Sequence, residues 1–303
     1  MKSKQMSSLV SPYLIQDGSR FRLKDVDPDD AGDLNKDQAA AKTGLREGIE
    51  RLCELQEKLY AEDQWGVLLI FQAMDAAGKD GAIQHVMSGI NPQGCEVYSF
   101  KQPSAEELDH DFLWHTVRRL PERGRIGIFN RSYYEEVLIV RVHPEILARQ
   151  KLPSTILGKD VFEGRYEDIN AHERYLSRNG YLIRKFFLHI SKDEQTKRIQ
   201  ARLDDPRKQW KFSLGDLREQ ERWTDYMAAY ERAIQRTSTP HAPWIVVPAN
   251  HKWFARLVVV AAIIEGLESL HPEFPSLTAD KRQELEEGRK VLRRQGGTAK
   301  PKR

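Results

Sequence analysis

The sequence has few cysteines and lacks any apolar run long enough to cross a membrane. Its two cysteines, Cys53 and Cys95, form no metal-binding or redox motif, which indicates a reducing compartment. The longest apolar run, Leu257 to Ile264, is far shorter than the roughly 20 residues of a membrane-spanning helix. The first residues also lack the pattern of a secretory signal. We therefore expect a soluble, cytoplasmic protein without a membrane partner.

Most of the chain also lacks an excess of positive charge. The formal net charge of +3 depends on residues 289–303, which hold seven lysines and arginines and no acid. The remaining residues contain 41 basic and 45 acidic side chains, a net charge of −4. Such a body does not attract polyanions over its whole surface, so we expect no nucleic-acid partner. A polyanion would have to bind in a local groove.

The stretch from Val67 to Gly81, VLLIFQAMDAAGKDG, has the order of a phosphate-binding loop. It opens with five apolar residues, which predict a strand buried on both faces of a parallel sheet. A loop of small residues follows, and Lys79 stands where the next helix should begin. Backbone N–H groups at such a helix start bind phosphate, and the lysine adds a positive charge. Besides Lys79, the residues predicted to bind phosphate here are Ala76, Ala77, Gly78, Asp80 and Gly81.

Two positions depart from the usual pattern G-x-x-x-x-G-K-[ST]. Ala73 replaces the first glycine, and Asp80 replaces the hydroxyl residue that ordinarily helps to hold Mg²⁺. Carboxylates, those of Asp75 and Asp80, are therefore the expected ligands of the metal or of its water molecules. The alternative interpretation is a glycine turn between a strand and a helix, with Lys79 as a surface lysine.

A second candidate group lies where the predicted strand 126–130 ends. Ligands bind at the carboxyl ends of strands in open α/β sheets, and an arginine there can hold a phosphoryl group with two hydrogen bonds. Arg131 has this position. The preceding residue is Asn130, where P-loop proteins often have an Mg²⁺-holding aspartate, so a metal would depend on Asp75. The alternative for Arg131 is a salt bridge to Glu135, one helical turn further on.

A third group is the basic segment at about 196–215. Arg198 and Arg202 share one face of a predicted helix, which ends at Asp204-Asp205-Pro206, and Lys208 and Lys211 follow on a loop. A helix, a cationic loop and a second helix would suit a mobile lid over phosphate groups. The alternative is a solvated charged helix.

Two further cations are candidates for an anion track. Lys101 follows the predicted strand 95–100, so it should lie at the same sheet edge. Arg118 is the one arginine before strand 126–130 that we also consider.

Strands and helices alternate along the chain, which predicts one doubly wound α/β domain with helices on both faces of the sheet. The predicted strands are 67–71, 95–100, 126–130, 181–190 and 243–248, and the predicted helices include 36–61, 104–120, 133–142 and 159–179. We expect residues 1–35 to be an irregular lead-in and residues 36–275 to form the domain. Residues 276–303 should form a C-terminal helix and a basic tail.

Four phrases in this order resemble the polyphosphate kinase 2 family: QAMDAAGKDG, VYSFKQPSAEELDHDFLWH, FNRSYYEEVLIVRVHPE and DDPRKQWKFS. The resemblance extends over about residues 36–270. It implies a P-loop kinase-like, three-layer fold with a five-stranded, mainly parallel sheet and a helical lid. It also implies transfer of the terminal phosphoryl group of inorganic polyphosphate to AMP or ADP, with Mg²⁺ as cofactor, to form ADP or ATP.

The resemblance also implies roles for individual residues. Asp75, Lys79 and Arg131 would be catalytic, with Asp75 holding Mg²⁺. The lid cations Arg202, Lys208 and Lys211 would bind polyphosphate, and Asn130, Tyr134 and Glu135 would contact the nucleotide. The NRSYYE version is similar to the subgroup that accepts both AMP and ADP.

Several points stay open at this stage. We expect a homo-oligomer, and the sequence does not choose between a dimer and a tetramer or fix the direction of transfer. Two other functions fit the same motifs: an ATP-dependent nucleotide or small-molecule kinase, and a non-catalytic nucleotide-binding protein.

Overall fold

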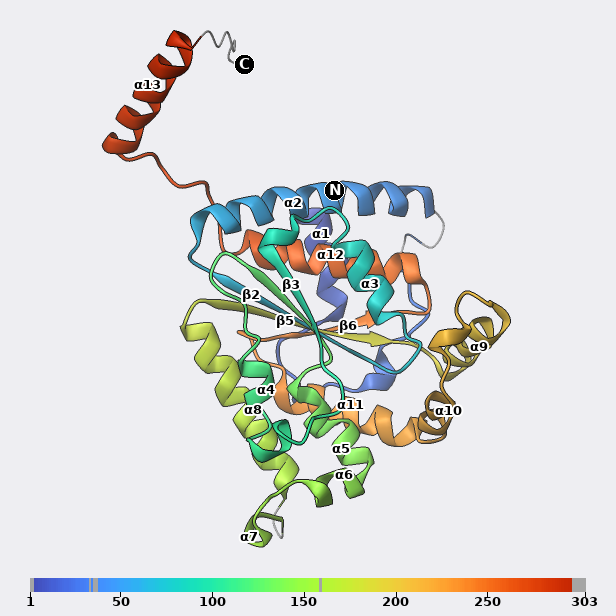
Figure 1. Cartoon of the computed structure of the whole chain (residues 1–303). Helices are drawn as coiled ribbons and strands as arrows, with labels where there is room; N and C mark the ends of the chain where they lie inside the picture. Colours follow the sequence, from blue (N-terminus) through green and yellow to red (C-terminus); the bar gives the residue numbers. More distant parts are fainter. Residues whose placement is uncertain (1–2, 33, 35–37, 158–159, 296–303) are drawn as a thin grey trace.

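The computed structural model describes residues 3–32, 34, 38–157 and 160–295 (Figure 1). Within these residues six strands form one sheet in the order β1-β6-β5-β2-β4-β3. The strands are β1 Leu14–Ile15, β2 Gly66–Ala73, β3 Cys95–Ser99, β4 Ile126–Asn130, β5 Tyr181–His189 and β6 Trp244–Pro248. β2 is central and parallel to both β4 and β5, and β1 alone among these strands runs antiparallel to its neighbour. The carboxyl ends of the five parallel strands therefore meet at one edge.

Helices cover both faces of the sheet, which gives three layers (Figure 1). One face packs against α1 Ser3–Val10, α2 Gln38–Glu62, α3 Lys79–Val86 and α12 Lys252–Glu268. The other face packs against α5 Ile139–Val142, α8 Val161–Arg178 and α11 Trp223–Thr237. Side chains of β2 alternate between the two cores: Val67, Leu69 and Phe71 enter the first, and Leu68 and Ile70 enter the second. These five side chains are at most 1% exposed, so the predicted strand buried on both faces is confirmed.

The remaining helices lie at the ends of the sheet or beyond it. They are α4 Trp114–Val117, α6 Pro144–Arg149, α7 Ser154–Leu157, α9 Lys192–Asp204, α10 Leu214–Glu221 and α13 Ala279–Arg294. The longest apolar run, 257–264, is fully buried in α12, and residues 258–264 belong to the first core. Among the helices described, none combines the length and the apolar character that crossing a bilayer requires.

The prediction that residues 1–35 are irregular is wrong, and so is the count of five strands. α1 packs Met6 and Val10 into the first core, and β1 adds an antiparallel edge strand beside β6. A strand of two residues is too short to show an alternating pattern, so the sequence carried no signal for it.

Two predicted helices are shorter than expected. Segment 104–120 begins with a capped turn, in which the Ser104 hydroxyl and the Glu107 carboxylate each accept a hydrogen bond from the other residue's backbone N–H. The helix is interrupted because the Asp111 side chain accepts the Leu113 N–H and starts a new turn. Segment 133–142 is a 3₁₀ turn over Tyr133–Val137 followed by α5.

The predicted C-terminal helix is confirmed as α13, which extends away from the body of the molecule (Figure 1). Four of the seven tail cations, those at 289, 290, 293 and 294, lie on this helix. The other three lie in 296–303, outside the described residues.

Candidate active site

The small-residue loop joins the central strand to α3 in a strained conformation. Ala76 has φ +62° and Gly78 has φ +96°, so both residues adopt the left-handed backbone region. That conformation costs a residue with a side chain on the order of 1 kcal/mol, and such strain collects at ligand sites. Gly78 precedes α3 without a side-chain cap, which leaves the first N–H groups of the helix free to bind an anion.

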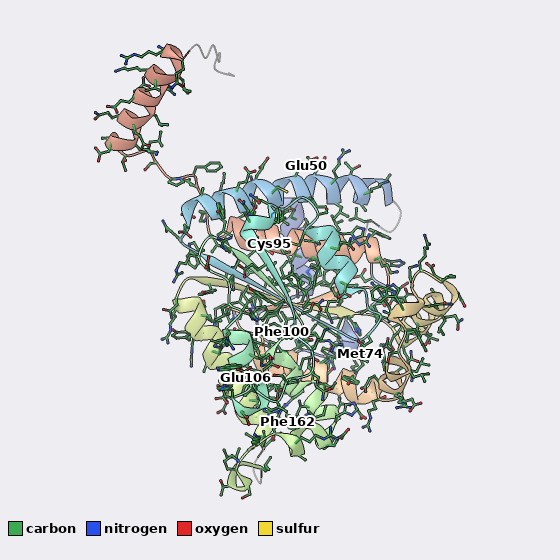
Figure 2. The ribbon with its side chains drawn as sticks, viewed as in Figure 1. Glu50, Met74, Cys95, Phe100, Glu106 and Phe162 are labelled. Atoms are coloured by element: carbon green, nitrogen blue, oxygen red, sulfur yellow. The ribbon has the colours of Figure 1, made fainter. Side chains whose placement is uncertain are left out.

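This loop opens into a cavity of about 720 Å³ at the carboxyl edge of the sheet. Met74 and Phe100, labelled in Figure 2, lie where β2 and β3 reach the cavity. The lining contains eight cationic side chains and three acidic ones. The cations are Lys79, Lys101, Arg131, Arg202, Lys208, Lys211, Lys252 and Arg256, and the acids are Asp75, Asp80 and Asp216. The cavity is thus strongly positive in a body that is net acidic outside its tail.

Arg131 and Asp75 face each other across the loop. An Arg131 guanidinium nitrogen lies 3.2 Å from Asp75 Oδ1, and both side chains are more than a third exposed. The alternative pairing of Arg131 with Glu135 is therefore not the one the structure has. Arg131 has φ +66°, and its N–H donates to the Phe71 carbonyl oxygen, so the strand pairing fixes this arginine beside the loop.

Lys79 lies half-buried among these groups. Burial and the nearby Arg131 lower its pKa, whereas neighbouring carboxylates oppose the change. Burial raises the pKa of Glu135, and Arg131 and Lys79 act against that rise. Asn130 donates a hydrogen bond of 2.8 Å to Asp80 Oδ1, which fixes the carboxylate that follows the lysine. Loop, strand end and helix start therefore form one electrostatic cluster.

Arg198 supports the loop from beneath. Its guanidinium donates to the carbonyl oxygens of Ala77 and Ala249 at 2.6 Å each, and to that of Asn250 at 2.9 Å. From the same face of α9, Gln195 donates to the Asp75 carbonyl oxygen at 2.9 Å. We predicted Arg198 to share its helix face with Arg202, but the sequence pattern did not show that it points under the loop.

The lid segment has the expected order of helix, loop and helix: α9, a 3₁₀ turn over Gln209–Lys211, and α10. Arg202 pairs with Asp216 of α10 at 2.9 Å, and Lys208 pairs with Asp205 at 2.8 Å. Lys211 lies over the ring of Trp210, a residue that is 77% exposed although it lines the cavity.

Two cations that line the cavity were not predicted from the sequence. Lys252 and Arg256 are four residues apart in the first turns of α12. Within the part of the chain that the structure describes, neither forms a hydrogen bond or an ion pair. Burial lowers the pKa of Lys252, and so do Arg198, Arg256 and Lys208, which places it in a field of like charges. Ligands bind at the carboxyl ends of parallel strands, and this rule could have predicted Lys252, because Lys252 follows β6 as Lys101 follows β3.

Some predicted residues are not brought to the cavity. Arg118 stacks over the Trp114 ring at 4.6 Å and does not line the cavity. Tyr134 is fully buried, and its hydroxyl donates to Glu173 and accepts from Lys185, so direct contact with a nucleotide would require it to leave the core. Glu135 is half-buried and does not line the cavity. The predicted loop residues 76–81, Asn130 and Lys101 all line the cavity.

This arrangement places the chain in the class of P-loop proteins that bind phosphate groups. Comparison with known families narrows the class: a family model described as polyphosphate kinase 2 matches residues 34–275, and the chain belongs to that family. The fold is accordingly P-loop kinase-like, as predicted.

Relatives with known names support this assignment. An ADP-polyphosphate phosphotransferase of Rhodopseudomonas palustris is 58% identical over 82% of this chain and 86% of its own. An AMP/ADP-polyphosphate phosphotransferase of Meiothermus ruber is 46% identical over 88% of this chain and 96% of its own. The crystal structure of polyphosphate kinase 2 from Arthrobacter aurescens superposes with a TM-score of 0.81 at 44% identity, covering 90% of this chain and 95% of that one.

Proposed function

We propose that this protein transfers the terminal phosphoryl group of inorganic polyphosphate to ADP, forming ATP, and to AMP, forming ADP. The observation that carries the proposal is the cavity: eight cations and three acids surround a phosphate-binding loop in a body that is otherwise net acidic. The positive charge is local, as a polyanion groove requires.

The chain's own residues supply positioning and charge neutralisation. An acceptor phosphate oxygen is already ionised at neutral pH, so the reaction needs no covalent nucleophile and no strong general base. The N–H groups at the start of α3 would hold the transferring phosphoryl group, and Lys79 and Arg131 would stabilise the charge that develops on it.

Four further cations that line the cavity come from two elements. Lys208 and Lys211 come from the lid, and Lys252 and Arg256 come from α12. Polyphosphate is an extended chain of charges, so it can contact both groups along its length, whereas ATP ends at its nucleoside. These four residues favour the polymer as donor.

We further propose Mg²⁺ as the cofactor, held by Asp75 with Asp80 in support. Mg²⁺ at phosphoryl-transfer sites is bound by one or two carboxylates, and phosphate oxygens and water complete its shell. The described residues contain no group of three or more possible ligands, so the ion would share its shell with substrate. It would neutralise charge on the phosphate oxygens.

Substitution of Asp75 by asparagine tests this assignment. We expect Asp75→Asn to raise the Mg²⁺ concentration needed for half-maximal rate, because Asn130 replaces the carboxylate that often stands at the neighbouring strand end. An unchanged Mg²⁺ titration would remove Asp75 from the metal shell and make Asp80 the ligand to test.

A donor panel separates the proposal from its alternatives. Purified protein is incubated with Mg²⁺ and AMP or ADP, with either polyphosphate or a nucleoside triphosphate as donor, and the nucleotides are resolved by chromatography. We expect nucleotide products with polyphosphate. Products with triphosphate donors alone would indicate an ATP-dependent kinase, and binding without turnover would indicate a switch protein.

A further inference from the structure

Helix α13 presents an apolar stripe that nothing in the described part of the chain covers. Leu285 and Leu292 lie seven residues apart on one face and are 41% and 61% exposed. Gly288 stands between them, and a Cβ added there would meet no atom within 4 Å. The helix projects from the body (Figure 1), and each of its residues is exposed.

Alone, a helix of this kind is weakly stable. It has 16 residues, and isolated helices of that length are marginal in water. Gly288 costs roughly 1 kcal/mol relative to alanine in a helix interior. The ion pairs Lys281–Glu284 and Arg289–Glu286 stabilise the helix by only a few tenths of a kcal/mol each. A packing partner on the stripe would explain why leucines and a glycine stand there.

The charges along α13 identify the partner. Before Gly288 the helix carries four acids and two cations, and after Gly288 it carries four cations and no acid. The acids are Asp280, Glu284, Glu286 and Glu287, and the cations are Lys281 and Arg282 before the glycine and Arg289, Lys290, Arg293 and Arg294 after it. Two parallel copies would place parts of like net charge side by side, whereas two antiparallel copies place each net-acidic part against a basic part. The helix is thus complementary to itself about a two-fold axis near Gly288.

We propose that α13 pairs with α13 of a second copy of this chain, antiparallel, with Leu285 of one copy against Leu292 of the other. The family model ends at residue 275, before α13 begins, so this contact lies outside the part that the chain shares with its family. The glycine at the centre lets the two backbones approach closely. Helices about 24 Å long bury less than the roughly 1,200 Å² of a stable interface, so we expect a reversible, concentration-dependent association.

Analytical ultracentrifugation over a range of concentrations tests the contact. We expect Leu285→Ser with Leu292→Ser to weaken association by at least about tenfold. The matched control is Gln283→Ser, an uncharged residue on the opposite face of the helix, which should leave association within about twofold of wild type. A wild type that stays monomeric, or equal association of the control and the double variant, would overturn the proposal. Thermal unfolding checks that the body is intact.

The orientation is tested by oxidation in a background with Cys53→Ala and Cys95→Ala. Chains carrying Leu285→Cys should form disulfide-linked dimers when mixed with chains carrying Leu292→Cys, and should not do so by themselves. Self-linked Leu285→Cys dimers would mean a parallel pair and would overturn the antiparallel arrangement.

Discussion

Lys79 is half-buried and Lys185 is fully buried, and the two side chains have different surroundings. Lys185 is fully buried in β5, and its ammonium donates to Glu173 at 2.6 Å, to the Thr237 carbonyl oxygen at 2.7 Å and to the Tyr134 hydroxyl at 2.9 Å. All three of its donors are used. Lys79, at the cavity, forms no hydrogen bond or ion pair with any residue that the structure describes.

The arginines repeat the contrast. Arg198 uses its guanidinium on backbone carbonyl oxygens of two loops, whereas Arg256 lines the cavity without such a bond among the described residues. Charge in the core is satisfied by the protein and holds the fold together. At the cavity, Lys79, Lys252 and Arg256 have no ion pair among the described residues and are left for a ligand, which is why substitutions in the two regions should fail in different ways.

The largest effect should come from the core. Lys185→Met leaves the Glu173 carboxylate buried without its cation, and removing one partner of a buried pair costs about 3–5 kcal/mol of unfolding free energy. Urea denaturation measures this loss. The double variant Lys185→Met with Glu173→Leu should recover part of it, because no unpaired charge remains. A loss under about 1 kcal/mol in the single variant would contradict a structural role.

At the cavity, Lys79→Ala should lower the rate of phosphoryl transfer and leave the stability of the fold intact. We expect a rate lower by about a hundredfold, equivalent to about 3 kcal/mol of transition-state stabilisation, with the unfolding free energy nearly unchanged. Initial rates with polyphosphate and ADP measure it. Near-normal turnover by a well-folded variant would refute the phosphate-loop assignment.

Arg198 is buried like Lys185, but it holds the loop of the cavity, so its substitution should affect the rate. We expect both Arg198→Lys and Arg198→Gln to lower kcat by about tenfold, or ~1.4 kcal/mol, because neither side chain can bridge the carbonyl oxygens of both loops. KM for ADP should change little. Rescue by Arg198→Lys would show that only the positive charge matters, and that outcome would contradict a positioning role.

The smallest effect should come from the exposed lid. Lys208→Ala with Lys211→Ala should raise the apparent KM for long polyphosphate roughly fivefold and that for short chains less, since exposed cations each contribute up to about 1 kcal/mol. The difference should grow as salt is lowered, because exposed charges are screened. Equal weakening of both lengths at two salt concentrations would confine the lid to the transferring phosphoryl group, and Lys101 would be the next cation to test.

The sequence predicted well wherever one local pattern determines the structure. The apolar run of β2 and the small-residue loop before Lys79 needed no tertiary knowledge. The rule that parallel strands end at one edge was enough to bring Asp75, Asn130 and Arg131 together.

What could not be predicted depends on the direction in which a side chain points. Helical spacing placed Arg198 and Arg202 on one face of α9, but only packing decides that Arg198 turns under the loop while Arg202 lines the cavity. Tyr134 follows Arg131 closely in sequence, yet its ring turns into the core toward Glu173. Lys252 and Arg256 lie in the first turns of α12, and the apolar run 257–264 was the feature of that helix that the sequence made visible.

The most direct test of the central claim follows one phosphoryl group. Polyphosphate labelled in its terminal phosphate is mixed with excess enzyme, Mg²⁺ and ADP, and the products of a single turnover are separated. Transfer through the cationic cavity predicts that the label appears in the terminal phosphate of ATP with wild-type protein and remains in the polymer with Lys79→Ala. Label released as inorganic phosphate, or retained in the polymer by the wild type, would contradict the account.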